Sequence, residues 1–507
     1  MSWFNHVAGL VLVIAATLLI FSLLPLGTAM QLGGDEGYEL MKGFLCSKGY
    51  VLYKDIWCDQ PPLYPNLLGC AFQVFGPSLL VARLLAAGFG MLLLAVFCQL
   101  LRQCASTWAT VAAVFFLLAS PGVLFLSASV MLEVPAIATA LVSAWLVFQW
   151  TKRPHWLWLA ASGVMMGLAL QIKLTAVVVL PAILAQMVVA GWDHARSAAP
   201  DRRAKTSHAS PSASAGPIGA SLHAVLRFGS AAAVAFLVVA FTWGRGSLQS
   251  SWRSHTGVQM IPGLSSPDDY RFEASLLLGH PECLLGAAIA LVMLGRQGRW
   301  RELLFPVVML LTALTVHSLH RPWWVYYYLH LAVPLAWLSG LGLGEVLKGA
   351  SQLFPADKSR LSGATWCKGL GACVLVALLL AVSEVRLEAS IKSIRQSPKA
   401  SASPLLAKMK EYAPRTHWAY AQPVIYPFHA RLPVPPEIAV VMLKRYWSGQ
   451  ITPTEIVDVC RRYKPEQLVL YQSRVGSEWK DLLKAEYQSA YQDTNYVLFI
   501  SKQLADK

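Results

Sequence analysis

Apolar residues along the chain form repeated blocks of roughly 20 residues, the length a helix needs to cross about 30 Å of hydrocarbon at 1.5 Å per residue. Short polar segments separate these blocks. The pattern predicts a polytopic α-helical membrane protein with about eleven transmembrane helices. The predicted spans are residues 7–26, 79–101, 108–126, 134–150, 156–170, 174–190, 225–243, 275–294, 303–319, 325–343 and 369–382.

Lys173 decides how residues 156–190 cross the bilayer. The segment is too long for one span and just long enough for two short ones. A lysine at the centre of a span costs roughly 2.5–3.5 kcal/mol on insertion scales, whereas at a turn its charge reaches water or an anion. We therefore predict two helices with a turn at Lys173.

The composition and the positions of basic residues agree with a membrane protein. The chain is 56% hydrophobic and 14% charged, against about 25% charged residues in soluble domains. Its net charge of +15 is explained by topology rather than by nucleic acid, because the basic residues gather on one predicted side, which the positive-inside rule assigns to the cytoplasm. The expected location is the cell (inner or plasma) membrane, with a cytoplasmic N-terminus. The basic residues on this side are Arg102, Lys152, Arg153, Arg196, Arg202, Arg203, Lys205, Arg227, Arg296, Arg299, Arg301, Lys348, Lys358, Arg360 and Lys368.

Two domains are expected from this pattern. Residues 1–384 form the transmembrane domain, with a first external loop at 28–78 and a Ser-, Ala- and Pro-rich cytoplasmic linker at 191–224. Residues 385–507 turn soluble in character and are expected to form a small C-terminal extracytoplasmic α/β domain.

Local patterns in the tail predict its elements. Thr452, Pro453 and Glu455 have the spacing of a capped helix start, with Pro at the first helical position. Residues 467–471 and 496–500 are short apolar runs typical of buried strands. Helix and strand thus alternate in the predicted domain.

The nine cysteines include no CxxC pair and no Cys/His cluster with zinc spacing. A zinc or thioredoxin-like site is therefore not predicted. Cys46 and Cys58 lie in the first external loop, where a disulfide and two free thiols both stay open.

The first external loop carries the densest polar pattern. Asp35 and Glu36 follow the first span directly, and Tyr38 comes next. An aromatic stretch and a Pro-Pro turn after Gln60 complete the loop. Such a segment is expected to fold along the membrane surface, where its carboxylates can meet a lipid-borne substrate.

This loop resembles that of the GT-C superfamily of membrane glycosyltransferases, and is most similar to bacterial relatives of dolichyl-phosphate-mannose protein mannosyltransferases and to lipid A aminoarabinose transferases. In that family the loop carries an Asp-Glu pair, a Tyr, a Gly, an aromatic stretch and a Lys-Pro-Pro-Leu-Tyr-like turn. The matching residues are Asp35, Glu36, Tyr38, Gly49, Tyr53, Pro61, Pro62, Leu63 and Tyr64.

Later segments carry weaker matches. Glu133 resembles the acidic residue before the family's fourth span, Lys173 closes a similar Gly-Leu-Ala-x-x-x-Lys turn, and residues 321–334, which include Tyr327, resemble the late Arg/Tyr/Pro segment. Gln60 departs from the family, because many members have a Lys there that is expected to contact the donor phosphate. The charge must then come from another residue. The external-side candidates are Lys54, Lys173, Arg253, His255 and Arg321, of which we favour Lys173 and Arg321.

The resemblance implies an inverting transferase that moves a monosaccharide from a polyprenyl-phosphate donor to a hydroxyl of a lipid, a cell-envelope glycan or a protein. A phosphate-linked sugar already has a good leaving group, so the reaction needs a base more than an acid. Asp35 is expected to be that base, and Glu36 to orient Asp35 or the acceptor. Substrate-binding roles are expected for Tyr38, Tyr53, Lys54, Gln60, Tyr64, Glu133, Lys173, Arg253, His255, Arg321 and Tyr327.

Two other classes of protein stay open. A transporter or lipid flippase shares the span count, although transporters have paired, Gly/Pro-broken halves with charges near the midplane, and here the carboxylates cluster in one surface loop. A scaffold that has lost activity is the second, because of Gln60. No cofactor is expected, and catalysis is predicted to be metal-independent, with a divalent ion left open.

Overall fold

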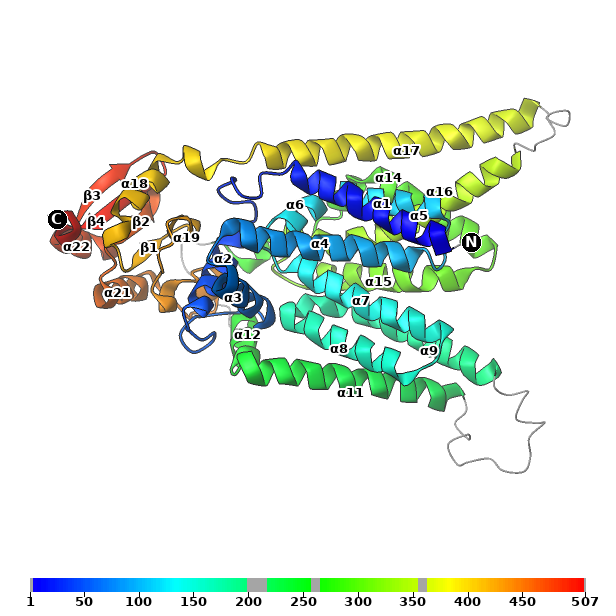
Figure 1. Cartoon of the computed structure of the whole chain (residues 1–507), viewed down its shortest axis with the longest axis horizontal. Coiled ribbons are helices and arrows are strands. Elements are labelled where there is room, and N and C mark those ends of the chain that lie inside the picture. The colour runs from blue at the N-terminus through cyan, green and yellow to red at the C-terminus, as the bar shows by residue number, and fades with distance from the viewer. Residues whose placement is uncertain (1–2, 198–216, 257–264, 354–362, 506–507) are drawn as a thin grey trace.

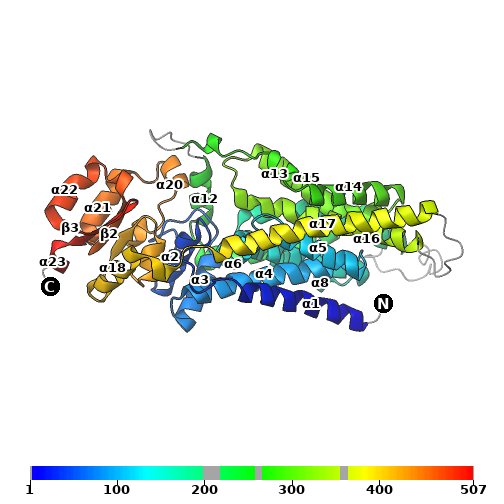
Figure 2. The ribbon, with the colours of Figure 1, turned by 90° about the horizontal axis from the view of Figure 1, so that it is seen from above.

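The computed structural model describes residues 3–197, 217–256, 265–353 and 363–505. The molecule is elongated, with a bundle of long helices at one end and a four-stranded sheet at the other (Figure 1). The perpendicular view in Figure 2 shows α2, α3 and α12 between the bundle and the sheet. This junction positions the candidate site.

The bundle contains most of the helical residues. Within the described residues, seven helices are long and apolar enough to cross a membrane, and three shorter apolar helices, α1, α5 and α8, accompany them. The predicted class of polytopic membrane protein is confirmed, while the count of about eleven spans stays a prediction. The bundle helices are α1 (Trp3–Ser22), α4 (Leu79–Leu101), α5 (Thr107–Ala119), α6 (Val123–Ala128), α7 (Glu133–Lys152), α8 (Trp156–Ile172), α9 (Leu180–Ser197), α11 (Pro217–Trp243), α13 (Ser275–Leu278), α14 (Pro281–Arg296), α15 (Trp300–Leu319), α16 (Leu329–Leu353) and α17 (Gly363–Arg395), with 3₁₀ turns η1 (Leu174–Val179) and η4 (Val325–Tyr328).

The predicted break at Lys173 is present. Helix α8 ends at Ile172, and Lys173 has an extended backbone before η1 and α9 continue the chain. Two other segments, each predicted as one continuous span, are divided into two helices. Residues 108–126 divide into α5 and α6 at Pro121 and Gly122, and residues 275–294 divide into α13 and α14 at Pro281. Proline lacks the N–H that would continue a helix, which explains both breaks.

Two predicted boundaries differ from the helix ends in the structure. Helix α9 extends to Ser197 and α11 begins at Pro217, so the linker predicted at 191–224 is shorter than expected, and residues 198–216 of it lie outside the described residues. Helix α17 continues past the predicted domain boundary at 385 as far as Arg395. Apolar periodicity marks where a helix meets lipid or core, and it gives no signal where the same helix continues into water.

Small residues set the close packing of α8 on α11. An added Cβ at Gly163 would lie 2.2 Å from the carbonyl oxygen of Phe228, and one at Gly167 would lie 2.5 Å from that of Ala232. Glycines four residues apart on one helix face let two backbones approach in this way within a membrane. The pair therefore fixes the position of α8, whose C-terminal end presents Lys173.

The sheet and its helices form the C-terminal part. Strand order is β1-β2-β4-β3, with β1 parallel to β2 and the other neighbours antiparallel. The predicted strands are present as β2 and β4, and the predicted capping box begins α21, where Thr452 Oγ1 accepts from the Glu455 N–H at 3.3 Å and the Glu455 carboxylate accepts from the Thr452 N–H at 2.7 Å. The elements are β1 (Ala419–Ala421), β2 (Gln467–Tyr471), β3 (Tyr487–Gln492), β4 (Tyr496–Ser501), α18 (Pro404–Tyr412), α19 (Ile425–His429), α20 (Leu443–Trp447), α21 (Pro453–Tyr463), α22 (Ser477–Glu486) and α23 (Lys502–Ala505), with 3₁₀ turns η6 (Ala400–Ala402), η7 (Ala413–Arg415), η8 (Pro436–Ile438) and η9 (Gln472–Arg474).

The segment predicted as the first external loop is about half helical. It contains α2 (Glu36–Ser47) and α3 (Leu63–Phe75), which pack so closely that an added Cβ at Gly43 would lie 2.6 Å from Leu68 Cβ. Helix α12 (Ser247–Thr256) and turn η3 (Pro267–Asp269) lie in the segment between α11 and α13. The junction is therefore a folded layer that joins the bundle to the sheet.

Replacing Gly163 with Leu should lower the stability of the protein by about 1–3 kcal/mol, because the new side chain would force α8 away from α11. Thermal unfolding of the purified full chain in detergent measures this. Gly229→Leu is the matched control, since no atom lies within 4 Å of an added Cβ at Gly229 on the exposed face of α11. Equal melting temperatures for the two variants would contradict the close packing.

Candidate active site

A buried ion pair holds the chain just before the site. Arg83 of α4 and Glu36 of α2 both have no exposed side-chain surface, and two bonds of 2.9 and 2.8 Å join the guanidinium to the carboxylate. Arg83 Nη1 also donates to the carbonyls of Leu26 and Ala29. The connection from α1 to α2 is thereby tied to the bundle.

Glu36 has further partners that fix a second segment. Its carboxylate accepts from the backbone N–H of Leu32 at 2.6 Å and from that of Val130 at 3.0 Å, the latter just before α7. Glu36, predicted beside Asp35 as a second catalytic carboxylate, is therefore fully buried among Arg83 and two backbone N–H groups. Its bonds position the backbone that carries Asp35.

A cavity of about 570 Å³ opens at the junction. One wall is apolar and comes mainly from α6 and its flanks, where Phe125, Leu126 and Leu132 line it. A polar wall is formed by charged and polar groups from six separate segments of the chain. These are Asp35, Tyr38, Glu39, Asp59, Gln60, Glu133, Lys173, Tyr326, Lys444 and Tyr446.

Asp35 lies at the N-terminal end of α2 and lines this cavity. Burial raises the pKa of its carboxyl above the ordinary value of 3.8, and the charge of Lys173 partly offsets that rise. The hydroxyl of Tyr326 donates to Asp35 Oδ2 at a long 3.5 Å. A carboxylate held in this way is suited to accept a proton.

Lys173 faces the cavity from the break between α8 and η1. Its ammonium group forms an ion pair with the fully buried Glu133 at the start of α7. It also lies 4.8 Å from the ring centroid of Tyr326 and 5.1 Å from that of Tyr327. The cation is thus held by one carboxylate and two aromatic rings at the edge of the cavity.

Lys444 supplies a second cation that the sequence analysis missed. It lies on α20, is largely buried, and its Nζ is 3.5 Å from Asp59 Oδ2. Asp59 also accepts from Gln60 Nε2 at 2.7 Å. Lys444 therefore stands beside Gln60, the position where the family motif has its Lys. No local pattern around Lys444 marks it, because the contact joins residues 385 positions apart.

A buried pair underlies the polar wall. Lys42 donates to Glu39 at 2.6 Å with both side chains nearly fully buried, and burial raises the pKa of the Glu39 carboxyl, an effect that Lys42 opposes. Cys58 lies 3.8 Å from the Lys42 ammonium, and both Cys46 and Cys58 are free thiols. This part of α2 is therefore stabilised by charge pairing without a disulfide.

The predicted site residues separate into two groups. Asp35, Tyr38, Gln60, Glu133 and Lys173 line the cavity together. The other predicted residues whose side chains the structure describes do not line it.

Three of these support the site from behind. The Tyr53 hydroxyl donates to the Gln60 carbonyl at 2.6 Å, Tyr64 is fully buried on α3 against Phe89, and Tyr327 stacks on His317. Their contacts are structural ones, made beneath the cavity wall.

Three more predicted cations do not reach the cavity. Lys54 and Arg253 are exposed away from it, and Arg321 is bound to Asp268 at 2.6 Å on the surface. The side chain of His255 lies outside the described residues. Among the residues that the structure describes, no three His, Cys, Asp or Glu side chains form a group that could hold a metal ion.

Comparison with known protein families finds one match, which covers part of the chain. Residues 59–200 match the sequence profile of the family described as dolichyl-phosphate-mannose-protein mannosyltransferase. A search of curated protein sequences finds no significant match. The matched segment contains α3 to α9, including the break at Lys173.

Solved structures give the fold over nearly the whole chain. The chain has the fold of the two solved structures given next, so the resemblance predicted from the first loop is confirmed at the level of the fold. The chain is similar to ArnT from Cupriavidus metallidurans bound to undecaprenyl phosphate, with a TM-score of 0.61, 15% identity, and coverage of 97% of this chain and 98% of that chain. It is also similar to the apo oligosaccharyltransferase of Archaeoglobus fulgidus, with a TM-score of 0.53, 13% identity, and coverage of 99% and 75%.

Glu36→Gln should destabilise the protein by about 3–5 kcal/mol, because it leaves the charge of Arg83 buried without its counter-ion. Thermal unfolding of the full chain in detergent measures the loss. Glu388→Gln on the exposed face of α17 is the control and should melt like the wild type. A Glu36→Gln protein of wild-type stability would contradict the anchoring role of the pair.

Proposed function

We propose that the chain is an inverting glycosyltransferase that moves a monosaccharide from a polyprenyl-phosphate donor to a hydroxyl of a lipid, a cell-envelope glycan or a protein. One observation carries this proposal: Asp35 and Lys173 line a single cavity that also has an apolar lining from α6 and its flanks. Asp35 can act as a base, Lys173 can bind a phosphate, and the apolar lining can bind a lipid chain in the same site. The similar ArnT structure bound to undecaprenyl phosphate supports the class of donor.

The proposed reaction uses Asp35 as the base. The acceptor oxygen attacks the anomeric carbon on the face opposite the phosphate while Asp35 takes its proton. The bond between the anomeric carbon and the phosphate oxygen breaks, and polyprenyl phosphate leaves with the electron pair. Attack and departure on opposite faces invert the anomeric configuration.

Lys173 and Lys444 are the proposed phosphate-binding cations. Negative charge grows on the phosphate oxygen as the bond breaks, and a cation held in place before the reaction stabilises it. Lys173 is held by Glu133 and Lys444 by Asp59, so neither needs to be ordered when the donor arrives. We assign no cofactor to this reaction.

The proposed orientation follows from the basic residues of the bundle. Arg102, Lys152 and Arg299 lie at the helix ends remote from the sheet, and the positive-inside rule gives that end to the cytoplasm. The cavity and the C-terminal sheet then face the extracytoplasmic side of a cell membrane. A polyprenyl-linked donor would enter from the outer leaflet along the apolar wall.

Two rival functions differ in what happens to the donor. A flippase would move the lipid-linked sugar without cleaving it, and an inactive scaffold would leave it unchanged. The clustering of Asp35, Glu133 and Lys173 at one end of the bundle favours chemistry over transport, because transporters place such groups near the midplane.

Asp35→Asn should lower the rate of sugar transfer by about 100-fold to 10,000-fold, since the amide cannot accept the proton. The measurement is transfer of radiolabelled sugar from a panel of polyprenyl-phosphate monosaccharides into lipid, polysaccharide and protein fractions. Asp458→Asn, an exposed change on α21, should retain wild-type transfer. If neither wild type nor variant consumes any donor, the flippase and scaffold interpretations replace the transferase.

The transfer rate should fall at low pH along a limb that lies above pH 3.8, because Asp35 acts deprotonated and burial raises its pKa. Lys173→Met should move this limb to higher pH, since the lysine charge lowers the pKa of Asp35. Lys173→Arg keeps the charge and should restore the wild-type position. Profiles of kcat/KM against pH test this. A limb at the same pH in Lys173→Met and wild type would disprove the effect of the Lys173 charge on Asp35.

Lys444→Gln should weaken binding of undecaprenyl phosphate, the lipid phosphate of the proposed donor, about tenfold, which corresponds to loss of one charge-assisted contact with phosphate. Titration of the full chain in nanodiscs with undecaprenyl phosphate measures the change in Kd. Lys408→Gln on α18 is the matched control, because that lysine lies on the surface and pairs with Glu411. Equal affinity of Lys444→Gln and wild type would remove Lys444 from the proposed phosphate site.

A further inference from the structure

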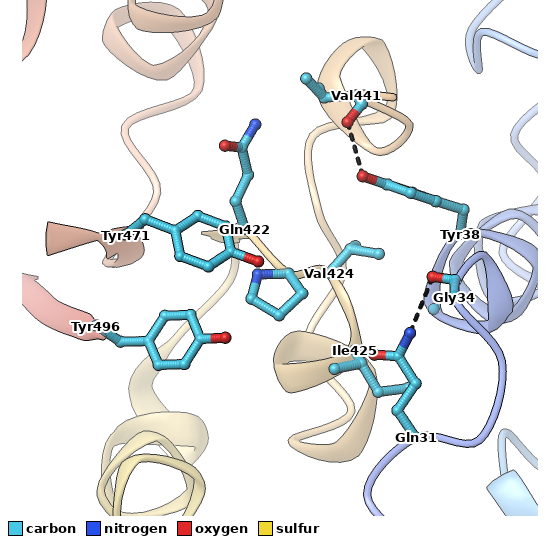
Figure 3. Close-up of a pocket in the computed structure, with 11 residues that line it drawn as sticks. Gln31, Gly34, Tyr38, Gln422, Val424, Ile425, Val441, Tyr471 and Tyr496 are labelled. Atoms are coloured by element: carbon cyan, nitrogen blue, oxygen red, sulfur yellow. Dashed lines mark hydrogen bonds between the residues drawn. The ribbon is translucent and has the colours of Figure 1, made fainter. Parts of the chain in front are cut away.

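A second cavity of about 360 Å³ lies between the loop that enters α2 and the end of the sheet (Figure 3). Its volume falls in the lower part of the roughly 300–1,000 Å³ range of ligand pockets. Tyr38 stands on one side, and Gln422, Tyr471 and Tyr496 stand on the other. None of the reaction steps proposed above uses this cavity.

The sheet topology brings Gln422, Tyr471 and Tyr496 together. Strands β1 and β2 are parallel, so their carboxyl ends meet at one edge of the sheet, and β4 begins there because it is antiparallel to β2. Gln422 follows the last residue of β1, Tyr471 ends β2, and Tyr496 begins β4 directly opposite Tyr471. Ligands of open α/β sheets commonly bind outside the carboxyl ends of parallel strands.

The lining has the chemistry of a site for a neutral, hydroxyl-rich ligand. Among the described residues that line the cavity, none carries a charge. The rings of Tyr471 and Tyr496 are partly exposed, with centroids 5.0 Å apart at 38°. Gln31 and Gln422 add side-chain amides. Aromatic faces pack on the C–H surfaces of a sugar ring, while amides and phenols exchange hydrogen bonds with its hydroxyls.

The second cavity adjoins the first. Both are lined by Gly34, Tyr38 and Val441, and the Tyr38 hydroxyl donates to the Val441 carbonyl at 2.7 Å between them. Gly34 directly precedes Asp35, and an added Cβ there would meet nothing within 4 Å. The space beside Gly34 therefore lies next to the residue that carries the proposed base.

We propose that the second cavity is an acceptor subsite, which binds a neutral saccharide unit and presents a hydroxyl to Asp35 past Gly34. This inference rests on the proposed transferase function and selects a glycan-bearing acceptor over a peptide. A peptide strand would pair along a free sheet edge, whereas this cavity lies at strand ends and offers rings and amides. A charged sugar is disfavoured because the cavity provides no counter-ion.

The test measures sugar binding and transfer separately. Full-length wild type, Tyr471→Ala and Gln422→Ala in nanodiscs are titrated with maltotriose, mannotriose and chitotriose as neutral probes, and with tri-galacturonate as a charged probe. Wild type should bind at least one neutral probe and exclude the charged one. Each variant should bind about tenfold more weakly, the loss expected from one aromatic or amide contact. Tyr412→Ala, which removes a half-buried tyrosine of α18 outside the cavity, should bind like wild type.

Transfer kinetics with the bound probe as acceptor complete the test. The variants should raise the acceptor KM about tenfold with a much smaller change in kcat, and Tyr471→Phe should recover most of the affinity because its ring remains. Wild type that binds no neutral probe, or variants that bind as wild type does, would overturn the subsite. Sugar binding without any transfer would instead contradict the transferase function and leave the subsite supported, so the two failures are distinguishable.

Discussion

Arg83 sits inside the bundle with no exposed surface, and its charge is tolerated there because Glu36 and two backbone carbonyls receive its donors. The same carboxylate binds the N–H groups of Leu32 and Val130, so one ion pair joins the end of α1, the start of α2 and the approach to α7. Asp35 comes directly before Glu36 in the chain. The location of the cavity is therefore a consequence of how a buried charge is neutralised.

Charge in the cavity is organised as adjacent pairs. Lys173 with Glu133 and Lys444 with Asp59 place two cations on the polar wall without leaving either one unpaired, while Asp35 has a weaker partner in Tyr326. A cation already held by a carboxylate can bind an anion without first being ordered. The apolar residues of α6 line the same cavity, and charges interact more strongly where less water surrounds them.

Much of the fold could be predicted because its signals are local. The break at Lys173 follows from the cost of a charge in a span, and the start of α21 follows from three neighbouring residues that satisfy a helix terminus. Asp35 and Lys173 could be proposed as neighbours only through a family resemblance. Lys444, Tyr471 and Tyr496 could not be found, because each meets the first loop across nearly 400 or more residues and no pattern near them records that contact.

The wall of the cavity combines residues from the first helical layer with Lys444 and Tyr446 from beyond the bundle. Neither the helical layer nor the C-terminal part encloses the cavity alone. The tail is therefore not a detachable module, because exchanging it for another sequence would alter the cavity as well as the surface around it. A change in what this cavity binds would then need matched substitutions on both sides of the junction, such as at Gln60 and at Lys444.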